Sequence, residues 1–276
     1  MNKISFTEKY NSFIFDLDGT IYRGNDIIPG ADKTINHLKK IGKRVLFISN
    51  KTTGTIDEYF EFLKSSGLNI DKSEIINSTL VLVKYLLSNY PSKKFFAIGE
   101  SVFINELVQA GMIFTKVPDE VDILIVTLDR TLNYEKLEIA ARALENGARF
   151  FAANIDDTCP VEIGEVLDAG STISALEKRT HKKLEMHFGK PSEFMMLEIK
   201  NTLNDDMANT LLLGDRLETD ILMGSKLGID TALVSTGVKL YLNGNSEVKP
   251  TYKLESVFDI VKDLYPREES NLRPKV

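Results

Sequence analysis

The sequence predicts an α/β protein with a Rossmann-like three-layer core, a parallel sheet and a second α/β block inserted into that core. Three observations predict this class. A strand, a helix and another strand follow one another near the N-terminus, the same rhythm repeats in a separate middle block, and it returns toward the C-terminus. Such alternation is typical of parallel sheets whose crossovers are helices.

The first strand–helix–strand unit begins with the apolar run Phe13 to Phe15, which predicts a buried strand. Apolar residues at helical spacing predict a helix over residues 31–41, and Val45 to Ile48 predicts a second strand. The two strands are then parallel neighbours, so Asp16 and Ser49 at their carboxyl ends open on one edge of the sheet. In open α/β sheets, ligands bind at that edge.

The remaining elements follow in order. Thr55 to Glu58 has the form of a capping box and predicts a helix start. We then expect alternating elements: helix 78–88, strand 95–98, helix 102–109, strand 122–128, helix 134–146, strand 149–152, loop 154–160, helix 171–179, helix 192–201, strand 211–213, helix 219–227 and strand 231–234. We infer a core formed by residues 1–78 and 184–276, with residues 79–183 inserted between its halves.

Composition narrows the class of protein. The chain has 276 residues, of which 43% are hydrophobic and 27% charged, as in an ordinary soluble globular protein. The formal net charge of −6 disfavours a nucleic-acid partner. The single cysteine excludes an intrachain disulfide, and the sequence has no signal-peptide pattern and no run of about 18 apolar residues. We therefore expect a cytoplasmic protein with no membrane association.

Two carboxylates, Asp16 and Asp18, end the first predicted strand and precede Gly19. If the strand continues to Asp18, both carboxylates point to one face. A hard cation such as Mg²⁺ would relieve their repulsion. Alternatively, the segment is an Asp-Gly turn that closes a strand. These residues alone leave both interpretations open.

Polar residues at other strand ends favour a phosphoryl-transfer site. Asp16 would attack phosphorus, and Asp18 would protonate the leaving oxygen and then take a proton from water. Asp215 would hold Mg²⁺ together with Asp16, while Ser49 and Lys190 would neutralise the phosphoryl oxygens. Taken singly, each residue has an ordinary structural role in a turn, a cap or on the surface. The joint pattern favours chemistry.

These residues carry a family resemblance. The segments Asp16-Leu17-Asp18-Gly19-Thr20, Ser49-Asn50, Gly189-Lys190-Pro191 and Gly214 to Ile221 resemble the four motifs of the haloacid-dehalogenase-like hydrolases. The fourth segment and the large insertion are most similar to the p-nitrophenylphosphatase and NagD-like branch, subclass IIA, which has an α/β cap. The resemblance spans about residues 13–264.

The resemblance implies a role for each motif residue. It implies that Asp16 is the nucleophile and Asp18 the general acid/base, that Asp16, Asp215 and the backbone carbonyl of Asp18 bind Mg²⁺, and that Asp220 supports the site. It also implies phosphate binding by the residues Ser49, Asn50 and Lys190. The acid/base aspartate favours a phosphatase over a dehalogenase.

The insertion corresponds to the cap that selects the leaving group in this branch. Its loop Asn154 to Pro160 resembles the segment that faces the substrate, so Asn154, Asp156 and Cys159 are the candidate substrate contacts. Cys159 is also compatible with a small apolar filler. The chain departs from the family pattern at Ala153, where a threonine is common, and at Lys51, where a second asparagine is common.

The sequence thus predicts a Mg²⁺-dependent phosphatase that hydrolyses phosphate monoesters of small metabolites through an aspartyl-phosphate. Sugar phosphates, phosphoglycolate, nucleotides and pyridoxal phosphate all remain open as substrates. A phosphotransferase or mutase that uses the same phospho-aspartate is the main alternative, and a non-enzymatic sensor of phosphorylated metabolites is another. The resemblance also suggests a homodimer formed through the cap.

Overall fold

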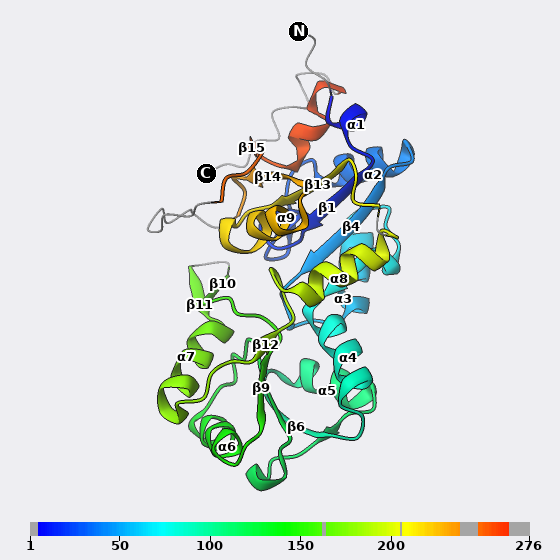
Figure 1. Ribbon diagram of the computed structural model, residues 1–276. Coiled ribbons are helices and arrows are strands. Elements are labelled where there is room, and N and C mark those ends of the chain that lie inside the picture. The colour runs from blue at the N-terminus through cyan, green and yellow to red at the C-terminus, as the bar shows by residue number, and fades with distance from the viewer. Residues whose placement is uncertain (1–4, 162–163, 205, 238–247, 265–276) are drawn as a thin grey trace. The chain divides into compact units, whose positions relative to one another are not determined.

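The computed structural model describes residues 5–161, 164–204, 206–237 and 248–264 (Figure 1). Contacts divide the chain into a first unit, Met1–Ser49, Ile56–Ile76 and Met196–Val276, and a second unit, Asn50–Thr55 and Asn77–Met195. This division describes how the chain packs and not which residues select a substrate. The cap boundaries at 79 and 183 therefore stay a prediction.

The first unit is built on a six-stranded sheet with the order β15-β14-β13-β1-β4-β5. The central strand β1 is buried throughout and pairs in parallel with both β4 and β13. The strands are β1 Ser12–Asp16, β4 Arg44–Ser49, β5 Ile75–Asn77, β13 Thr210–Gly214, β14 Asp230–Val234 and β15 Tyr252–Leu254. A separate hairpin pairs β2 Tyr22–Arg23 with β3 Asp26–Ile27.

Helices of the first unit pack on one face of its sheet, where every second residue of a strand points. Phe13, Phe15 and Phe47 belong to the same buried cluster as Ile35 of α2 and Leu63 of α3. The helices and single turns are α1 Phe6–Lys9, α2 Ala31–Lys40, α3 Ile56–Ser65, η1 Lys72–Glu74, η3 Leu217–Ile221, α9 Leu222–Leu227, η4 Val257–Ile260 and η5 Lys262–Leu264. Helix α8, Glu193–Thr202, begins in the second unit and ends in the first.

The connections that leave β1 and β13, two neighbouring strands of the first sheet, run in opposite directions. After β1 the chain passes through α2 to β4, whereas after β13 it passes through η3 and α9 to β14 on the other side. The strand order therefore reverses between β1 and β13. Ligands of open α/β sheets bind outside the carboxyl ends of the strands at such a point.

The second unit is a smaller α/β layer structure of its own. Its five strands have the order β12-β9-β8-β6-β7, and the pairs are parallel. The strands are β6 Lys94–Ile98, β7 Ile113–Phe114, β8 Ile123–Val126, β9 Arg149–Ala152 and β12 Met186–His187. The helices are α4 Ser78–Asn89, α5 Ser101–Gln109, η2 Pro118–Glu120, α6 Tyr134–Glu145 and α7 Ala169–Thr180.

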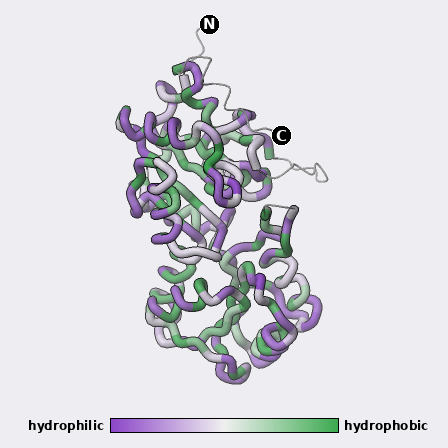
Figure 2. Tube along the Cα trace, turned by 180° about the vertical axis from the view of Figure 1, so that it is seen from behind, coloured by the Kyte–Doolittle hydropathy of each residue, from purple (hydrophilic) through white to green (hydrophobic). Residues whose placement is uncertain are grey.

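The second sheet lies between two helical layers. Helices α6 and α7 pack on one face, where Ala140, Leu144 and Ile173 share a buried cluster with Leu124 and Phe150. Figure 1 shows α4 and α5 on the other side of this sheet. In Figure 2 the apolar segments gather inside each unit and the hydrophilic segments lie toward its outside. The predicted α/β class with parallel sheets is confirmed.

Two local predictions differ from the structure. The predicted loop 154–160 is wrong in its second half, because β10 Thr158–Pro160 pairs antiparallel with β11 Glu165–Leu167. This pairing depends on a partner segment farther along the chain, which a local pattern does not reveal. The helix predicted for 219–227 begins earlier, as the π-helical turn η3, and continues as α9.

No helix in the described part of the chain has both the length and the apolar character needed to cross a membrane.

Candidate active site

Three carboxylates meet where the strand order of the first sheet reverses. Asp16 is the last residue of β1, Asp215 follows the last residue of β13, and Asp220 lies in the turn η3. One oxygen of each carboxylate lies within 4.8 Å of the others. All three residues are buried, with 5%, 3% and 0% of their surfaces exposed. The structure thus brings together Asp16, Asp215 and Asp220, which the sequence predicted for this site.

Glycines allow these carboxylates to approach one another. At Gly214 a Cβ atom would overlap the side chain of Asp220, and at Gly237 it would overlap the carboxylate of Asp215. The backbone N–H of Arg216 donates to Oδ2 of Asp220 at 3.2 Å. Tight backbone turns therefore hold two of the three acids in place.

The donor set fits a hard divalent cation. Buried carboxylates at this spacing repel one another, and proteins compensate such buried charge by pairing or by metal coordination. Mg²⁺ prefers oxygen ligands and is commonly bound by one or two carboxylates together with water and substrate phosphate. Asp16 and Asp215 would hold it, and Asp220 would support the group. The carboxylate of Asp18 is not a member of this group, in keeping with a contribution through its backbone carbonyl only.

Asp18 lies just beyond β1 and is hydrogen-bonded by a tyrosine. The phenol of Tyr22 donates to Oδ2 of Asp18 at 2.8 Å. Burial, with the negative charge of Asp18 as the next contribution, raises the pKa of Tyr22 well above its usual range, so the phenol keeps its proton. Tyr22 is not predictable from the motif, because nothing in the motif marks the fourth residue after Asp18.

Ser49 lies at the same sheet edge as Asp16. It is the last residue of β4, and Asp16 is in register with the preceding residue, Ile48. Its surface is only 2% exposed. The predicted placement of Ser49 beside the end of β1 is therefore observed, while its phosphate contact stays a prediction.

The residues after Ser49 belong by their contacts to the second unit, where Asn50 is tied to Lys190. The backbone N–H of Lys190 donates to Oδ1 of Asn50 at 2.6 Å, and Nδ2 of Asn50 donates to the Lys190 carbonyl at 3.3 Å. A Cβ atom at Gly189 would crowd Oδ1 of Asn50 at 2.5 Å and the carbonyl oxygen of Ala153 at 2.9 Å. These two predicted phosphate-binding residues thus form one hydrogen-bonded pair.

The candidate substrate loop contacts the same asparagine. Nδ2 of Asn50 donates to Oδ2 of Asp156 at 2.9 Å, and Nδ2 of Asn154 donates to the Asn50 carbonyl at 3.2 Å. Cys159 is half-buried on β10, opposite Val166 of β11. Asn154 and Asp156 hold Asn50 in this structure, and substrate contact by these residues and by Cys159 stays a prediction.

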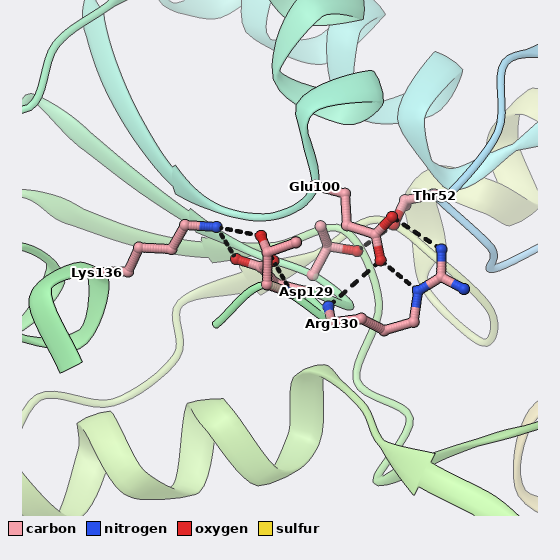
Figure 3. A network of polar contacts seen from close by, with 7 residues as sticks. Thr52, Glu100, Asp129, Arg130 and Lys136 are labelled. Atoms are coloured by element: carbon pink, nitrogen blue, oxygen red, sulfur yellow. Dashed lines mark hydrogen bonds and ion pairs between the residues drawn. The ribbon is translucent and has the colours of Figure 1, made fainter. Parts of the chain in front are cut away.

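The second sheet has its own reversal of strand order, between β6 and β8, and a polar network lies there (Figure 3). Glu100 follows β6, and it accepts from Nε and Nη2 of Arg130, which follows β8, at 2.5 and 2.9 Å. This hydrogen bonding from Arg130 lowers the pKa of Glu100. The hydroxyl groups of Thr52 and Thr127 pair at 2.6 Å in a buried position.

Arg130 also borders a cavity of about 480 Å³ in the second unit. The side chain of Arg130 remains 57% exposed despite its ion pair, so it is accessible to a ligand. The walls of the cavity combine apolar and hydroxyl side chains, such as Leu167 and Ser171, with the carboxylates of Asp129 and Asp168. Glu100 and Arg130 are not predictable from the sequence. An ion pair between residues that follow two different strands gives no local sequence signal.

Known proteins share this architecture. Residues 13–113 match the haloacid dehalogenase-like hydrolase family, and residues 187–263 match the HAD-hydrolase-like family. The chain is 34% identical to the sugar-phosphatase AraL of Bacillus subtilis (strain 168) over 250 residues, which are 90% of this chain and 91% of that protein.

Two solved structures are similar over nearly the whole chain. The p-nitrophenyl phosphatase from Archaeoglobus fulgidus has a TM-score of 0.84 at 32% identity and covers 92% of this chain and 99% of its own. The glycerol phosphate phosphatase from Mycobacterium tuberculosis, solved in complex with magnesium, has a TM-score of 0.80 at 26% identity and covers 94% of this chain and 78% of its own.

The chain therefore belongs to the haloacid dehalogenase-like hydrolases. Within that superfamily it is a phosphatase of the p-nitrophenylphosphatase and NagD-like type. The family and the enzyme class predicted from the four motifs are both confirmed.

Proposed function

We propose that this protein is a Mg²⁺-dependent phosphatase that hydrolyses phosphate monoesters of small metabolites through an aspartyl-phosphate on Asp16. The observation that carries the proposal is the buried group formed by Asp16, Asp215 and Asp220, with Asp18 next along the chain. Similarity to an enzyme solved with magnesium supports the choice of metal. Bound Mg²⁺ would shield the repulsion between the carboxylates and a phosphate and polarise the phosphoryl oxygens.

The two aspartates of the first motif divide the chemistry. A carboxylate oxygen of Asp16 attacks phosphorus, and the ester oxygen leaves with a proton from Asp18. Water then attacks the aspartyl-phosphate while Asp18 takes its proton, which releases inorganic phosphate and restores Asp16. Asp220 supports the carboxylate group from the turn η3.

The phosphate is bound by groups from two further motifs. Ser49 and Lys190 neutralise the phosphoryl oxygens, and Asn50 contributes its backbone N–H. The hydrogen bonds between the Asn50 side chain and the backbone of Lys190 support this role, because they fix both residues before a phosphate arrives. Preorganised donors need no rearrangement at the moment of reaction.

We propose that residues 79–183 act as the cap that selects the leaving group, with Asn154, Asp156 and Cys159 as contacts. A sugar phosphate is the favoured substrate class, because the similar AraL protein is a sugar phosphatase. A homodimer through the cap is part of the same proposal, and analytical ultracentrifugation of the whole chain tests it.

Hydrolysis of p-nitrophenyl phosphate with and without Mg²⁺ tests the main proposal. We expect turnover that EDTA abolishes and Mg²⁺ restores, and its loss in Asp16→Asn. Asp26→Asn is a matched control, since Asp26 is an exposed carboxylate on β3 outside the site. Undiminished turnover by Asp16→Asn would contradict the mechanism. A screen of phosphorylated metabolites, ranked by kcat/KM, would then name the substrate.

A further inference from the structure

The chain between Asp18 and Tyr22 folds back on itself in a compact turn. The N–H groups of Ile21 and Tyr22 donate to the carbonyl of Leu17 at 2.9 and 3.2 Å, and the N–H of Gly19 donates to the carbonyl of Tyr22 at 2.7 Å. Asp18 and Tyr22 also form an isolated bridge. The backbone that carries the phenol is therefore fixed relative to the backbone that carries the carboxylate.

The ring of Tyr22 is fixed as well. Only 2% of its surface is exposed, and it packs edge-to-face against Phe62 of α3 with ring centroids 5.2 Å apart. Its backbone pairs with Ile27 in the hairpin of β2 and β3. The phenol oxygen cannot move away from Oδ2 of Asp18 without losing this packing.

We propose that Tyr22 is a positioning residue for the acid–base step: its hydrogen bond occupies Oδ2 of Asp18 and directs Oδ1 toward the leaving group. The inference rests on the proposed function, in which Asp18 is the general acid and base. It adds an assignment of the two carboxyl oxygens and a residue that enforces it.

The protons balance in this assignment. As the bond between phosphorus and the ester oxygen breaks, the proton on Oδ1 of Asp18 passes to that oxygen, which leaves as an alcohol. Asp18 is then a carboxylate, with Oδ2 still accepting from Tyr22. When water attacks the aspartyl-phosphate, Oδ1 takes one proton from that water, and the cycle closes with no change at Tyr22.

This role predicts a dependence on the leaving group. A sugar or other alkyl alcohol is a poor leaving group and needs its proton during bond cleavage, whereas p-nitrophenolate leaves readily without one. Tyr22→Phe should therefore lower kcat/KM for an alkyl phosphate by roughly 10-fold, the usual effect of losing one hydrogen bond to a charged group. For p-nitrophenyl phosphate we expect a fall of less than about 3-fold.

Tyr10→Phe is a matched control within the same unit. Tyr10 is also buried, and its phenol also donates to a carboxylate, Oδ2 of Asp230, at 2.6 Å. Tyr10 precedes the amino end of β1, whereas Tyr22 follows its carboxyl end. This substitution should leave the ratio of the two kcat/KM values unchanged.

The experiment measures kcat/KM for p-nitrophenyl phosphate and for one sugar phosphate with wild type, Tyr22→Phe and Tyr10→Phe. Both rates come from the same folded molecules, so their ratio does not depend on the fraction of a variant that is folded. An unchanged ratio of the two kcat/KM values in Tyr22→Phe, whether both values fall equally or neither falls, would overturn the inference and leave the phosphatase assignment standing. If wild type hydrolyses neither substrate, the proposed function itself fails.

Discussion

The tight packing around Asp215 makes Gly19→Ala the most informative substitution. Gly19 has φ of +85°, and a Cβ atom there would lie 2.6 Å from Oδ2 of Asp215 and 2.8 Å from the Cα atom of Gly237. Real Cβ contacts are longer, so Asp215 or the backbone at Gly237 must move. Alanine at this position therefore suffers from both its backbone conformation and its surroundings.

Both the backbone conformation and the crowding lower the free energy of unfolding of Gly19→Ala. A left-handed conformation costs a non-glycine residue about 1–2 kcal/mol. Overpacking typically adds about 1–3 kcal/mol. In domains of about 150–250 residues, 1 kcal/mol shifts Tm by about 2–4 °C. We expect Gly19→Ala to destabilise the protein by about 2–5 kcal/mol and, because Asp215 is displaced, to raise the Mg²⁺ concentration needed for half-maximal activity at least ~10-fold.

Gly24→Ala separates the two contributions. Gly24 has φ of +60° and has no atom within 4 Å of the added Cβ, so only the backbone cost applies. Thermal unfolding and Mg²⁺ titration of p-nitrophenyl phosphate turnover compare the two variants. Gly19→Ala should melt about 2–12 °C below Gly24→Ala, and Gly24→Ala should keep the wild-type dependence on Mg²⁺. Indistinguishable variants would refute the reasoning that Gly19 is required by the carboxylate of Asp215.

Three further outcomes are expected. Chelation of Mg²⁺ should lower Tm, because the buried carboxylates lose their counter-ion. At a Mg²⁺ concentration 100 times Kd, binding adds about 2.7 kcal/mol to the free energy of unfolding. Calorimetry with and without EDTA measures this difference. On the proposal that residues 79–183 select the leaving group, Arg130→Gln should lower kcat/KM for a sugar phosphate about 10-fold more than for p-nitrophenyl phosphate, since the exposed Arg130 side chain borders a cavity of that segment and its loss removes a charged hydrogen-bond donor; equal losses would remove it from leaving-group selection. Because Arg130 lowers the pKa of Glu100, the stability from this pair is present above the unfolded pKa of a glutamate and is lost as pH falls through the lower folded value. The free energies of unfolding of wild type and Arg130→Gln should differ by about 0.5 kcal/mol at neutral pH and converge at acidic pH, once Glu100 is protonated in the folded protein.

Strand-end carboxylates could be predicted from the sequence because each follows an apolar run that is itself a strand. Asp16 and Asp215 were placed at one sheet edge by the alternation of strands and helices, and the structure brings them together. Asp220 was expected only in a supporting role, yet the turn η3 and Gly214 bring its carboxylate as close as the other two. A local sequence pattern predicts where a residue lies on a helix or strand. The geometry of a turn decides how close its side chain lies to the other carboxylates.

The hydrogen-bond partners of Asp18 and Glu100 could not be predicted in the same way. Tyr22 reaches Asp18 through a turn whose shape depends on backbone hydrogen bonds, and Arg130 reaches Glu100 across two strands that are neighbours in space but not in sequence. The hairpin of β10 and β11 was missed for the same reason. Interactions between segments with no shared periodicity are set by tertiary structure, which a single sequence does not display.

The position of Asn50 suits the proposed coupling of phosphate binding to leaving-group selection. Its side chain joins the backbone of Lys190 to the carboxylate of Asp156, and its carbonyl accepts from Asn154. The predicted phosphate-binding pair and the predicted leaving-group loop are therefore one hydrogen-bonded group within the second unit. The proposed nucleophile Asp16, the proposed acid Asp18 and the carboxylates of Asp215 and Asp220 belong to the first unit. On the proposed roles, a change in the loop around Asp156 should therefore act on Asn50 and Lys190 as well as on the choice of leaving group, whereas Ser49 belongs to the first unit.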